Sequence, residues 1–396
     1  MKHTFLDLGK HPMANNFLTN DQIADEFTFN LKVQWDSETR LVSLVDFVPP
    51  ENMFNDHYAY RSSLSQTMRN HFKSIADNIN LTYKPKTVLE IGSDDGVFLK
   101  HFDTTQAYAI EPCGNFCDMT NDMGYTTYNE FWTLELAEKL VKEIGTADVI
   151  YSANCMCHVQ NLSDAFDGIR KMLTPVYGVF VFEDPSFFSM FERTSYDQIY
   201  DEHAHIFSVT SLSNILKQHG LSIFRVDKLT VHGGSNRIWA CNSLSSAHPP
   251  QRSVTQALLG EQRRGVNFLH TYNTFATNVE QSKNDLLSLL TKLKNDNKKI
   301  VSYGATSKST TVFNYCGIDA NIISCIYDTT PEKQGKLLPG VHIPVLPYTE
   351  NSLDGIDYAF LGAWNYESEI INKEKKYVDR GGKFISHVPN VRVLPR

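Results

Sequence analysis

Cysteine is scarce in this chain of 396 residues, and long apolar runs are absent. Seven cysteines are few and odd in number, which argues against a disulfide scaffold. No apolar run approaches the ~18 residues needed to span a bilayer, and residues 1–17 lack the apolar core of a signal peptide. These absences predict a soluble, cytoplasmic protein that has reduced thiols and no membrane partner.

Basic residues are in the minority, with 37 Lys and Arg against 45 Asp and Glu. The formal net charge of −8 argues against a nucleic-acid-binding protein, because such proteins need a basic patch to displace counterions from phosphate. The length predicts two or three domains, since a single core usually stops growing at ~250 residues. We therefore expect a globular protein of several domains.

Short apolar runs alternate with helical stretches from residue 87 onward. The runs predict strands at 87–92, 108–112, 148–153 and 177–184, and helical spacing predicts helices at 65–80, 133–144 and 163–173. Ser163 is well placed to cap the last of these helices. The alternation implies right-handed crossovers and a parallel sheet. Residues 225–242 add two strands broken at Gly233 and Gly234, for which a hairpin is one option.

The two ends of the chain differ in pattern. Residues 1 to about 85 show no sustained period, apart from a candidate strand at 41–50 and the helix at 65–80. After a break at 247–251, apolar residues between 268 and 293 predict a long amphipathic helix, most simply a strut between domains. Strands expected at 299–304, 324–328, 357–363 and 382–387 then restart the alternation.

These patterns predict an α/β fold with two doubly wound, Rossmann-like domains. The predicted boundaries are 1–64 for a small N-terminal lid domain, 65–246 for the central domain, and 247–396 for the long helix with the C-terminal domain. In such folds, ligands bind at the carboxyl ends of the parallel strands. A ligand site is therefore expected where the predicted strands end.

A glycine turn follows the first predicted strand of the central domain. VLEIGSDDG, residues 88–96, has the spacing E-x-G-x-x-x-G rather than the G-x-G-x-x-G of dinucleotide sites. A turn without Cβ atoms lets the backbone approach a ligand. Glu111 ends the next strand, 19 residues after Gly92, where an acid can accept both hydroxyls of a ribose.

The same turn is unsuited to a pyrophosphate. Ser93 is followed by Asp94 and Asp95, whose carboxylates would repel phosphate charge in a cleft. A sulfonium cation and an ammonium group suit these acids better, which favours S-adenosylmethionine over NAD; a solvated acidic turn is the alternative. The predicted cofactor contacts are Glu90, Gly92, Ser93, Asp94, Gly96, Glu111, Pro112 and Asn154.

Proton-transfer groups crowd residues 196–208, YDQIYDEHAHIFS. Tyr200 and His203 supply proton donors and acceptors near neutral pH, and Glu202 can orient an imidazole. Such a group suits proton abstraction next to a carbonyl and stabilisation of the enolate that forms. A metal site built from Glu202, His203 and His205 is one alternative, and a polar structural cluster is the other.

Small hydroxylated residues follow the predicted strand at 299–304. Residues 303–310, YGATSKST, combine them with one cation, Lys308, at the start of a helix. Free N–H groups at a helix N-terminus bind anions, and Lys308 adds a donor. The P-loop pattern is absent. The segment predicts an anion site, with an ordinary capped turn as the alternative.

These motifs resemble, in order and spacing, the S-adenosylmethionine-dependent C-methyltransferases that act on nucleotide-linked 4-keto deoxysugars. The resemblance covers nearly the whole chain and is carried by residues 6–19, 88–96, 199–203, 231–237 and 303–318. VHGGSNR and YGATSKSTTVFNYCGI are its most specific parts. It implies a three-domain enzyme, in which a lid domain closes over a Rossmann-like methyltransferase domain and the C-terminal domain holds the nucleotide-sugar.

The resemblance also implies roles for individual residues. His203 is the base that deprotonates the sugar carbon beside the ketone, Tyr200 is its partner at the ketone oxygen, and Glu202 orients it. His158 lies near the sugar, and Tyr60, or Tyr58, reaches the active site from the N-terminal domain. The enolate carbon then attacks the cofactor's methyl group. Substrate contacts are expected from Tyr58, Ser62, His232, Asn236, Arg237, Tyr303, Gly304, Ala305 and Lys308.

The N-terminal segment departs from this family. Its first domain usually binds zinc through paired C-x-x-C motifs, whereas no cysteine precedes Cys113 here. We therefore predict no structural zinc, and no metal at Cys155, Cys157 and His158, because two thiols one residue apart form a poor tetrahedral set. Asp201 also stands where the family commonly has another histidine.

Three other functions stay open on the sequence. An O- or N-methyltransferase would use the same cofactor without an enolate base. A nucleotide-sugar oxidoreductase would bind NAD in the C-terminal domain, although residues 303–310 lack G-x-G-x-x-G. A catalytically silent binding module is the third, given the altered first domain.

Overall fold

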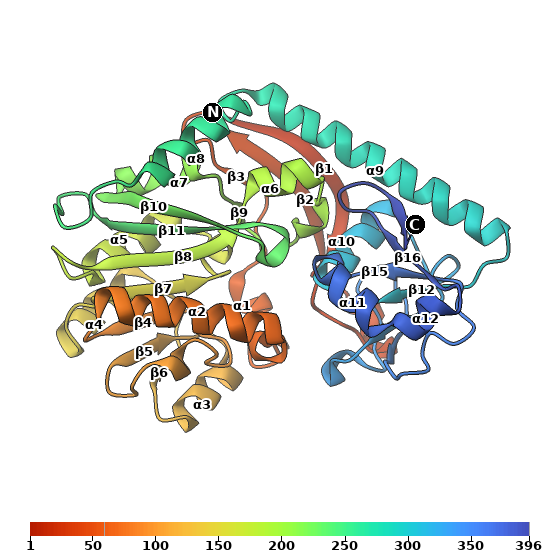
Figure 1. Ribbon diagram of the computed structural model, residues 1–396, viewed down its shortest axis with the longest axis horizontal. Helices are drawn as coiled ribbons and strands as arrows, with labels where there is room; N and C mark the ends of the chain where they lie inside the picture. Colours follow the sequence, from red (N-terminus) through yellow and green to blue (C-terminus); the bar gives the residue numbers. More distant parts are fainter. Residues whose placement is uncertain (59, 396) are drawn as a thin grey trace.

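Three β-sheets organise residues 1–58 and 60–395, which the computed structural model describes (Figure 1). One sheet is formed mainly by the N-terminal segment, and the other two are the parallel sheets of the central and C-terminal parts. The α/β class and the two Rossmann-like sheets predicted from the sequence are confirmed. No helix in these two ranges combines the length and apolar composition needed to cross a membrane.

The N-terminal sheet is antiparallel and was not expected from the sequence before residue 41. Leu31, Val33 and Trp35 alternate toward the core, but register shifts in the first strand disrupt its alternation. The last strand of the sheet comes from the centre of the chain, so the sheet ties the N-terminal segment to the residues around His203. Its strands, in spatial order, are β1 (Lys2–Pro12), β2 (Thr28–Asp36), β3 (Val42–Leu44) and β9 (His205–Ile206); a short helix, α1 (Pro50–Met53), follows β3 in the chain.

The central sheet has the order β10-β11-β8-β7-β4-β5-β6, parallel from β8 to β6, with β10 and β11 as an antiparallel hairpin. The strands and helices predicted for this part are confirmed, and so is the hairpin. The strands are β4 (Val88–Ile91), β5 (Ala107–Ile110), β6 (Thr126–Tyr128), β7 (Val149–Ala153), β8 (Val179–Pro185), β10 (Leu221–Leu229) and β11 (Ser235–Asn242). The helices are α2 (Gln66–Tyr83), α3 (Gly114–Asp122), α4 (Leu134–Glu143), α5 (Leu162–Met172), α6 (Phe187–Arg193) and α7 (Val209–Gln218).

The cap of α5 differs from the sequence prediction. The helix begins at Leu162, and the side chain of Asn161 accepts a hydrogen bond from the Asp164 N–H at 3.2 Å. Ser163 lies inside the first turn, so the prediction that Ser163 caps the helix is wrong. Asn at this position satisfies one of the free N–H groups that every helix start presents.

Replacing Asn161 by Ala should lower the free energy of unfolding by about 1 kcal/mol, because the cap bond is lost. The matched control, Ser163→Ala, should change it by less than about 0.5 kcal/mol. Denaturant titration of both variants measures the two values. A larger loss in Ser163→Ala than in Asn161→Ala would contradict the cap seen here.

The C-terminal sheet has the order β14-β13-β12-β15-β16-β17, and only its last strand is antiparallel. The four strands expected in this part of the chain are confirmed. The strands are β12 (Ile300–Tyr303), β13 (Ile326–Asp328), β14 (Val345–Pro347), β15 (Tyr358–Leu361), β16 (Lys383–Ser386) and β17 (Arg392–Leu394). The helices are α10 (Ser307–Cys316), α11 (Glu367–Lys373) and α12 (Lys375–Asp379).

Two helices connect the parallel sheets. The predicted long helix is α9 (Leu269–Asn295), and it is preceded by α8 (Arg252–Arg263), which the sequence reading missed. In Figure 1, β1 and β2 lie between the two parallel sheets, and α9 runs along their outer side toward the C-terminal part. Buried residues of α9 share one apolar core with the N-terminal and C-terminal sheets. The same core includes Phe187 of α6, the helix that follows the central strand β8.

Candidate active site

A cavity of about 900 Å³ lies where the parallel strands of the central and C-terminal sheets end. This is the position at which open α/β sheets bind ligands. Residues from the N-terminal segment complete its wall. The predicted site residues that line it are Tyr58, Tyr60, Ser62, Glu90, Gly92, Ser93, Asp94, Glu111, Pro112, Asn154, His158, Tyr200, Glu202, His203, His232, Tyr303, Gly304 and Lys308.

The end of β4 and the turn that follows it present buried polar atoms to this cavity. Glu90 Oε2, Ser93 Oγ and Asp94 Oδ1 are buried, and no partner among the described residues bonds them. Gly92 has a φ of +75°, and a Cβ there would lie 2.8 Å from the Sγ of Cys155. Buried acceptors without donors, beside a turn that tolerates no side chain, fit a ligand that donates hydrogen bonds.

Glu111 is held at the end of β5 by two backbone donors. It accepts from the Asp94 N–H at 2.8 Å and from the Cys113 N–H at 2.9 Å. Each carboxylate oxygen can accept a second hydrogen bond. The geometry therefore leaves room for the ribose hydroxyls that the spacing predicts.

Burial and mutual repulsion raise the pKa values of the acids at this end of the cavity. Burial, with Asp94 and Glu111 nearby, holds the pKa of Glu90 well above its usual value. Burial and the neighbouring Asp95 raise the pKa of Asp94 to about 7. A bound cation would favour the ionised carboxylates and lower both pKa values. This end of the cavity thus suits a cationic ligand and disfavours a pyrophosphate.

Tyr200 and His203 form a hydrogen-bonded pair in the middle of the cavity. His203 Nδ1 lies 2.6 Å from the carbonyl oxygen of Gln198, which can only accept, so Nδ1 carries the proton. Nε2 is then the lone-pair nitrogen, and the Tyr200 hydroxyl donates to it at 2.9 Å. Burial and the nearby His158 lower the pKa of His203 well below its usual value. The pair presents a neutral base at neutral pH.

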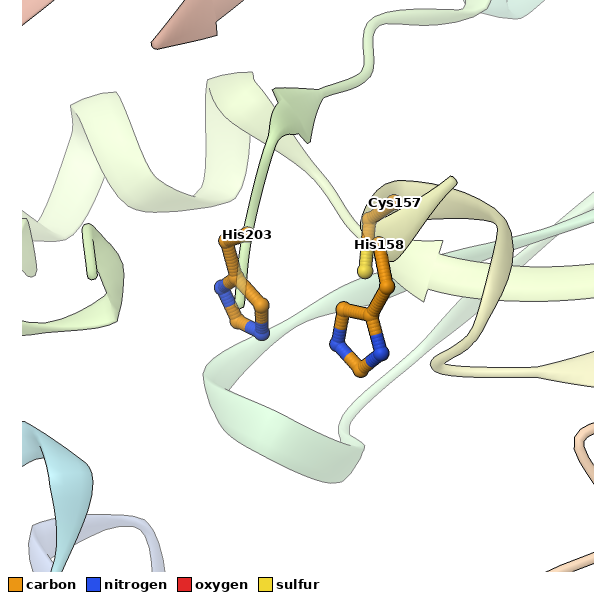
Figure 2. Close-up of side chains that lie close together, drawn as sticks. All are labelled: Cys157, His158 and His203. Carbon is orange, nitrogen blue, oxygen red and sulfur yellow. The ribbon is translucent and has the colours of Figure 1, made fainter. Parts of the chain in front are cut away.

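His158 lies beside this base (Figure 2). Its ring is nearly parallel to the His203 ring, with centroids 5.4 Å apart, and it stacks on Phe54 at 5.2 Å. Its Nε2 is buried without a partner among the described residues. Burial lowers the pKa of His158 to about 4. An uncommitted, neutral ring nitrogen therefore stands next to the base.

Glu202 does not orient His203, which corrects the sequence-based role, because the Gln198 carbonyl already fixes the imidazole. Glu202 instead accepts from Asn15 Nδ2 at 2.6 Å and from the Tyr58 hydroxyl at 3.1 Å. Both donors belong to the N-terminal segment. Glu202 therefore holds that segment against the active site through these two hydrogen bonds.

Asn15 is a site residue that sequence reasoning missed. It lines the cavity, and its neighbour Ala14 donates a backbone hydrogen bond to Asp201 at 2.8 Å. These contacts join positions 187 apart in the chain, so no local pattern reveals them. The only available signal was the resemblance of residues 6–19 to the family. Tyr60, the other N-terminal tyrosine, is 44% exposed and lies on the same wall.

The turn after β12 gives the opposite end of the cavity a positive charge. Lys308 lines the cavity, and no carboxylate of the described residues comes within 4.0 Å of its ammonium group. Lys333 also lines the cavity and donates to the Ala305 carbonyl at 2.9 Å. Two lysines here contrast with the acids after β4. The two ends of the cavity therefore suit ligand groups of opposite charge.

Asn154 and His232 meet on the wall between these two ends. Their side-chain nitrogens lie 3.2 Å apart, and both residues have a positive φ, +50° and +52°. Burial, with Lys308 nearby, lowers the pKa of His232 to about 3. Strained backbone at two adjoining cavity residues is typical of functional sites.

Four predicted residues are not among those lining the cavity: Gly96, Asn236, Arg237 and Ala305. The clearest case is Arg237, whose guanidinium Nε donates to the buried Glu183 at 2.6 Å. Asn236 lies on the same strand, β11, and is buried. The Ala305 N–H donates to Asp328 at 2.7 Å, and a Cβ at Gly96 would lie 3.0 Å from Cγ2 of Thr120. Direct contacts of these four residues with a ligand therefore stay a prediction.

The side chains that the structure describes give little support for a metal site. Among the described residues, one group of three side chains that could bind a metal converges: Cys157, His158 and His203, whose ligand atoms lie within 4.8 Å of one another (Figure 2). His203 already uses both ring nitrogens, so the group lacks three free donors. Residues 1–54 contain no cysteine and, as far as the structure describes them, no such group. They do not fit a tetrahedral zinc site.

Three family models match consecutive parts of the chain. Residues 1–54 match the model described as "Putative zinc binding domain", despite the missing cysteines. Residues 65–226 match "Methyltransferase domain", and residues 230–389 match "C-methyltransferase C-terminal domain". The last two matches contain the acidic turn, the Tyr200–His203 pair and the lysine-bearing turn.

One curated protein and two solved structures illustrate what the chain is similar to. The C-methyltransferase NovU of Streptomyces niveus is 30% identical over 396 residues, which span 98% of this chain and 93% of that protein. The magnesium protoporphyrin IX methyltransferase ChlM of Synechocystis, with bound SAH, matches at 12% identity and a TM-score of 0.35, over 44% of this chain and 83% of that one. The CcbJ methyltransferase of Streptomyces caelestis matches at 10% identity and a TM-score of 0.33, over 43% and 89%. On its nearly full-length match to NovU, the chain belongs to the family of S-adenosylmethionine-dependent C-methyltransferases.

Proposed function

We propose that this enzyme methylates the carbon beside the ketone of a nucleotide-diphosphate-linked 4-keto deoxysugar, through an enolate. One observation carries the proposal: a neutral Tyr200–His203 pair stands in one cavity between an acidic turn and two lysines. Deprotonation of carbon beside a ketone needs a positioned base and donors for the oxygen. The site offers both.

Bound S-adenosylmethionine supplies a methyl group activated by a sulfonium cation. Glu90, Asp94 and Glu111 would hold the cofactor, since all three carboxylates line the acidic end of the cavity. Gly92 leaves the turn free of a side chain. These residues bind and orient; none of them is a base for the acceptor carbon.

His203 acts as the base in this proposal. The substrate displaces the Tyr200 hydroxyl from Nε2, and Nε2 then takes the proton from carbon. Nδ1 stays bonded to the Gln198 carbonyl, which favours the imidazolium that forms. Tyr200 and His158 donate to the ketone oxygen as negative charge develops there. General-base catalysis typically increases the rate by about 10²–10⁴-fold. Each such donor typically increases it by about 10²–10³-fold.

The acid limb of the pH profile should lie below pH 6.5. Burial depresses the pKa of His203, so the imidazole stays neutral and basic until the pH falls through that lowered value. His158, Lys308 and His232 lower it further, whereas the bond to Gln198 opposes them. Measuring kcat/KM against pH tests this. Half-maximal kcat/KM at or above pH 7 on the acid side would contradict a neutral, buried base.

The lysine-bearing end would bind the diphosphate. Lys308 and Lys333 supply positive charge, and Thr306 caps α10 beside them by accepting from the Ser309 N–H at 3.1 Å. Incubation with S-adenosylmethionine and a nucleotide-linked 4-keto deoxysugar should give a product heavier by one methylene group. The matching 4-hydroxy sugar, which lacks the ketone, should give none. Equal transfer to both sugars would refute the substrate class.

We also propose that the N-terminal sheet needs no zinc. Trp35 of β2 stacks on Tyr272 of α9 with ring centroids 5.0 Å apart, and β3 pairs with β9. Packing and strand pairing therefore hold this sheet. Overnight dialysis against a strong chelator should leave the unfolding temperature unchanged. A drop that zinc alone restores would show that a metal stabilises the fold.

A further inference from the structure

A buried carboxylate lies in the chain just ahead of the base. Asp197 belongs to the short 3₁₀ turn Tyr196–Gln198, is fully buried, and is not among the residues lining the cavity. The next residue, Gln198, supplies the carbonyl that bonds His203 Nδ1 at 2.6 Å. The hydrogen bond that one ring nitrogen makes decides which tautomer a histidine adopts. A contact that fixes Asp197 therefore helps to fix the acceptor that selects the tautomer of His203.

The partners of this carboxylate come from the C-terminal sheet. Trp364, which follows β15, donates its indole N–H to Asp197 Oδ2 at 2.5 Å. His387, which follows β16, is buried with its Nε2 3.6 Å from the same oxygen. A hydrogen bond to a charged acceptor is about twice as strong as a neutral one. Asp197 thus joins the turn before the base to the carboxyl ends of two C-terminal strands.

Two other contacts link this stretch of chain to the C-terminal helix α10. The Thr311 hydroxyl donates to the Ile199 carbonyl at 3.0 Å. The Tyr196 hydroxyl lies 3.6 Å from Cys316 Sγ. The match to the methyltransferase domain, residues 65–226, contains this stretch. The turn that orients the base therefore belongs to one part of the chain and is held by another.

The ring of Trp364 is closely packed. A Cβ at Gly233 would overlap Cη2 of the indole, so the ring lies directly against this backbone. Gly233 follows His232, which meets Asn154 on the cavity wall. Because closely packed side chains have little room to shift, the indole N–H is a fixed donor for Asp197.

We propose that Asp197 is a positioning residue for the base. Held by the Trp364 N–H, it places the Gln198 carbonyl so that the proton of His203 stays on Nδ1 and the lone pair stays on Nε2. This inference rests on the proposed role of His203 as the base. Asp197 acts through Gln198, since it lies behind the cavity wall. A displacement of about 1 Å caused by a group away from the chemistry can cost about 10²-fold in rate.

Two variants break the contact from opposite sides. Asp197→Ala removes the acceptor, and Trp364→Phe removes the donor while keeping an aromatic ring against Gly233. Each should lower kcat and the exchange of the substrate's ring proton with solvent by about 100-fold, and leave the affinity for S-adenosylhomocysteine unchanged. Asp197→Asn keeps an oxygen that can accept the indole N–H, so its kcat should stay within about 10-fold of the unaltered enzyme.

The tautomer of His203 gives a readout that a loss of stability does not change. ¹⁵N NMR of enzyme labelled in its histidines shows which ring nitrogen carries the proton, and the His203 signals are those missing from His203→Asn. In the unaltered enzyme and in Asp197→Asn, the proton should be on Nδ1. In Asp197→Ala and Trp364→Phe, it should be shared between Nδ1 and Nε2.

Glu261→Gln is the matched control. Glu261 is also a buried carboxylate that accepts hydrogen bonds, from the N–H groups at the start of α7, and it is not among the residues lining the cavity. This variant should unfold at a lower temperature and keep both the kcat and the His203 tautomer of the unaltered enzyme. A loss of kcat in Glu261→Gln equal to that in Trp364→Phe would show that destabilisation alone explains the effect, and overturns the role of Asp197.

Trp364→Phe decides the question even if Asp197→Ala does not fold. A proton that stays on Nδ1 in Trp364→Phe overturns the role of Asp197 and leaves His203 as the base. If the unaltered enzyme exchanges no ring proton, the proposed function fails instead. The tautomer comparison needs no substrate, so it still tests Asp197 in that case.

Discussion

Replacing His203 by Asn should reduce kcat by about 10²–10⁴-fold and leave the affinity for S-adenosylhomocysteine unchanged. The amide N–H of Asn can still donate to the Gln198 carbonyl, which His203 Nδ1 bonds at 2.6 Å. What the variant loses is the Nε2 lone pair that now accepts from Tyr200. The variant should therefore be impaired in proton removal and not in cofactor binding.

Solvent exchange separates the two steps. With S-adenosylhomocysteine bound, the unaltered enzyme should exchange the substrate's ring proton beside the ketone for solvent deuterium, and His203→Asn should not. His205→Asn is the matched control, since His205 lies two residues away on β9 and is not among the residues lining the cavity. That variant should keep the exchange. Undiminished exchange in His203→Asn would remove His203 from the role of base.

Replacing Gly92 by Ala should weaken S-adenosylhomocysteine binding by at least about 100-fold. The residue has a φ of +75°, and the new Cβ would lie 2.8 Å from Sγ and 2.9 Å from Cβ of Cys155. A left-handed conformation costs a residue with a Cβ about 1–2 kcal/mol, and overpacking adds about 1–3 kcal/mol. The turn can relieve this strain only by moving away from Cys155, which displaces the cofactor acceptors that precede and follow it.

Gly145 provides the control for the backbone cost. Its φ is +79°, and a Cβ there would meet no atom within 4 Å. Gly145→Ala should therefore destabilise the fold by a similar backbone term while binding S-adenosylhomocysteine normally. Calorimetry on both variants gives the comparison. Equal affinities in the two variants would show that the turn after β4 does not hold the cofactor.

The elements that the sequence predicts correctly are those whose pattern is local. Buried strands such as β4 and β7 are short apolar runs, and α2 and α9 bury residues at helical spacing. β1 was missed because register shifts break its alternation. α8 has a weak apolar face, and its main anchor is polar: the buried Glu261 accepts from the N–H groups of Val209 and Thr210 at the start of α7.

The same distinction between local patterns and long-range contacts applies to the candidate site. Motifs on single turns placed Gly92, Glu111, His203 and Lys308 at the cavity, because strand ends meet along one edge of a sheet. Contacts between distant segments could not be predicted that way. The bond from Asn15 to Glu202 joins positions 187 apart, and the Gln198 carbonyl that fixes His203 is a backbone atom with no signature in the sequence.

Carbon methylation next to the ketone is the central claim, and the position of the transferred methyl group tests it most directly. The enzyme would be supplied with S-adenosylmethionine labelled with ¹³C in its methyl group, and the nucleotide-sugar product would be examined by NMR. The account predicts that the labelled carbon is bonded to the ring carbon adjacent to the carbonyl group. A labelled methyl group bonded to oxygen or nitrogen would contradict it.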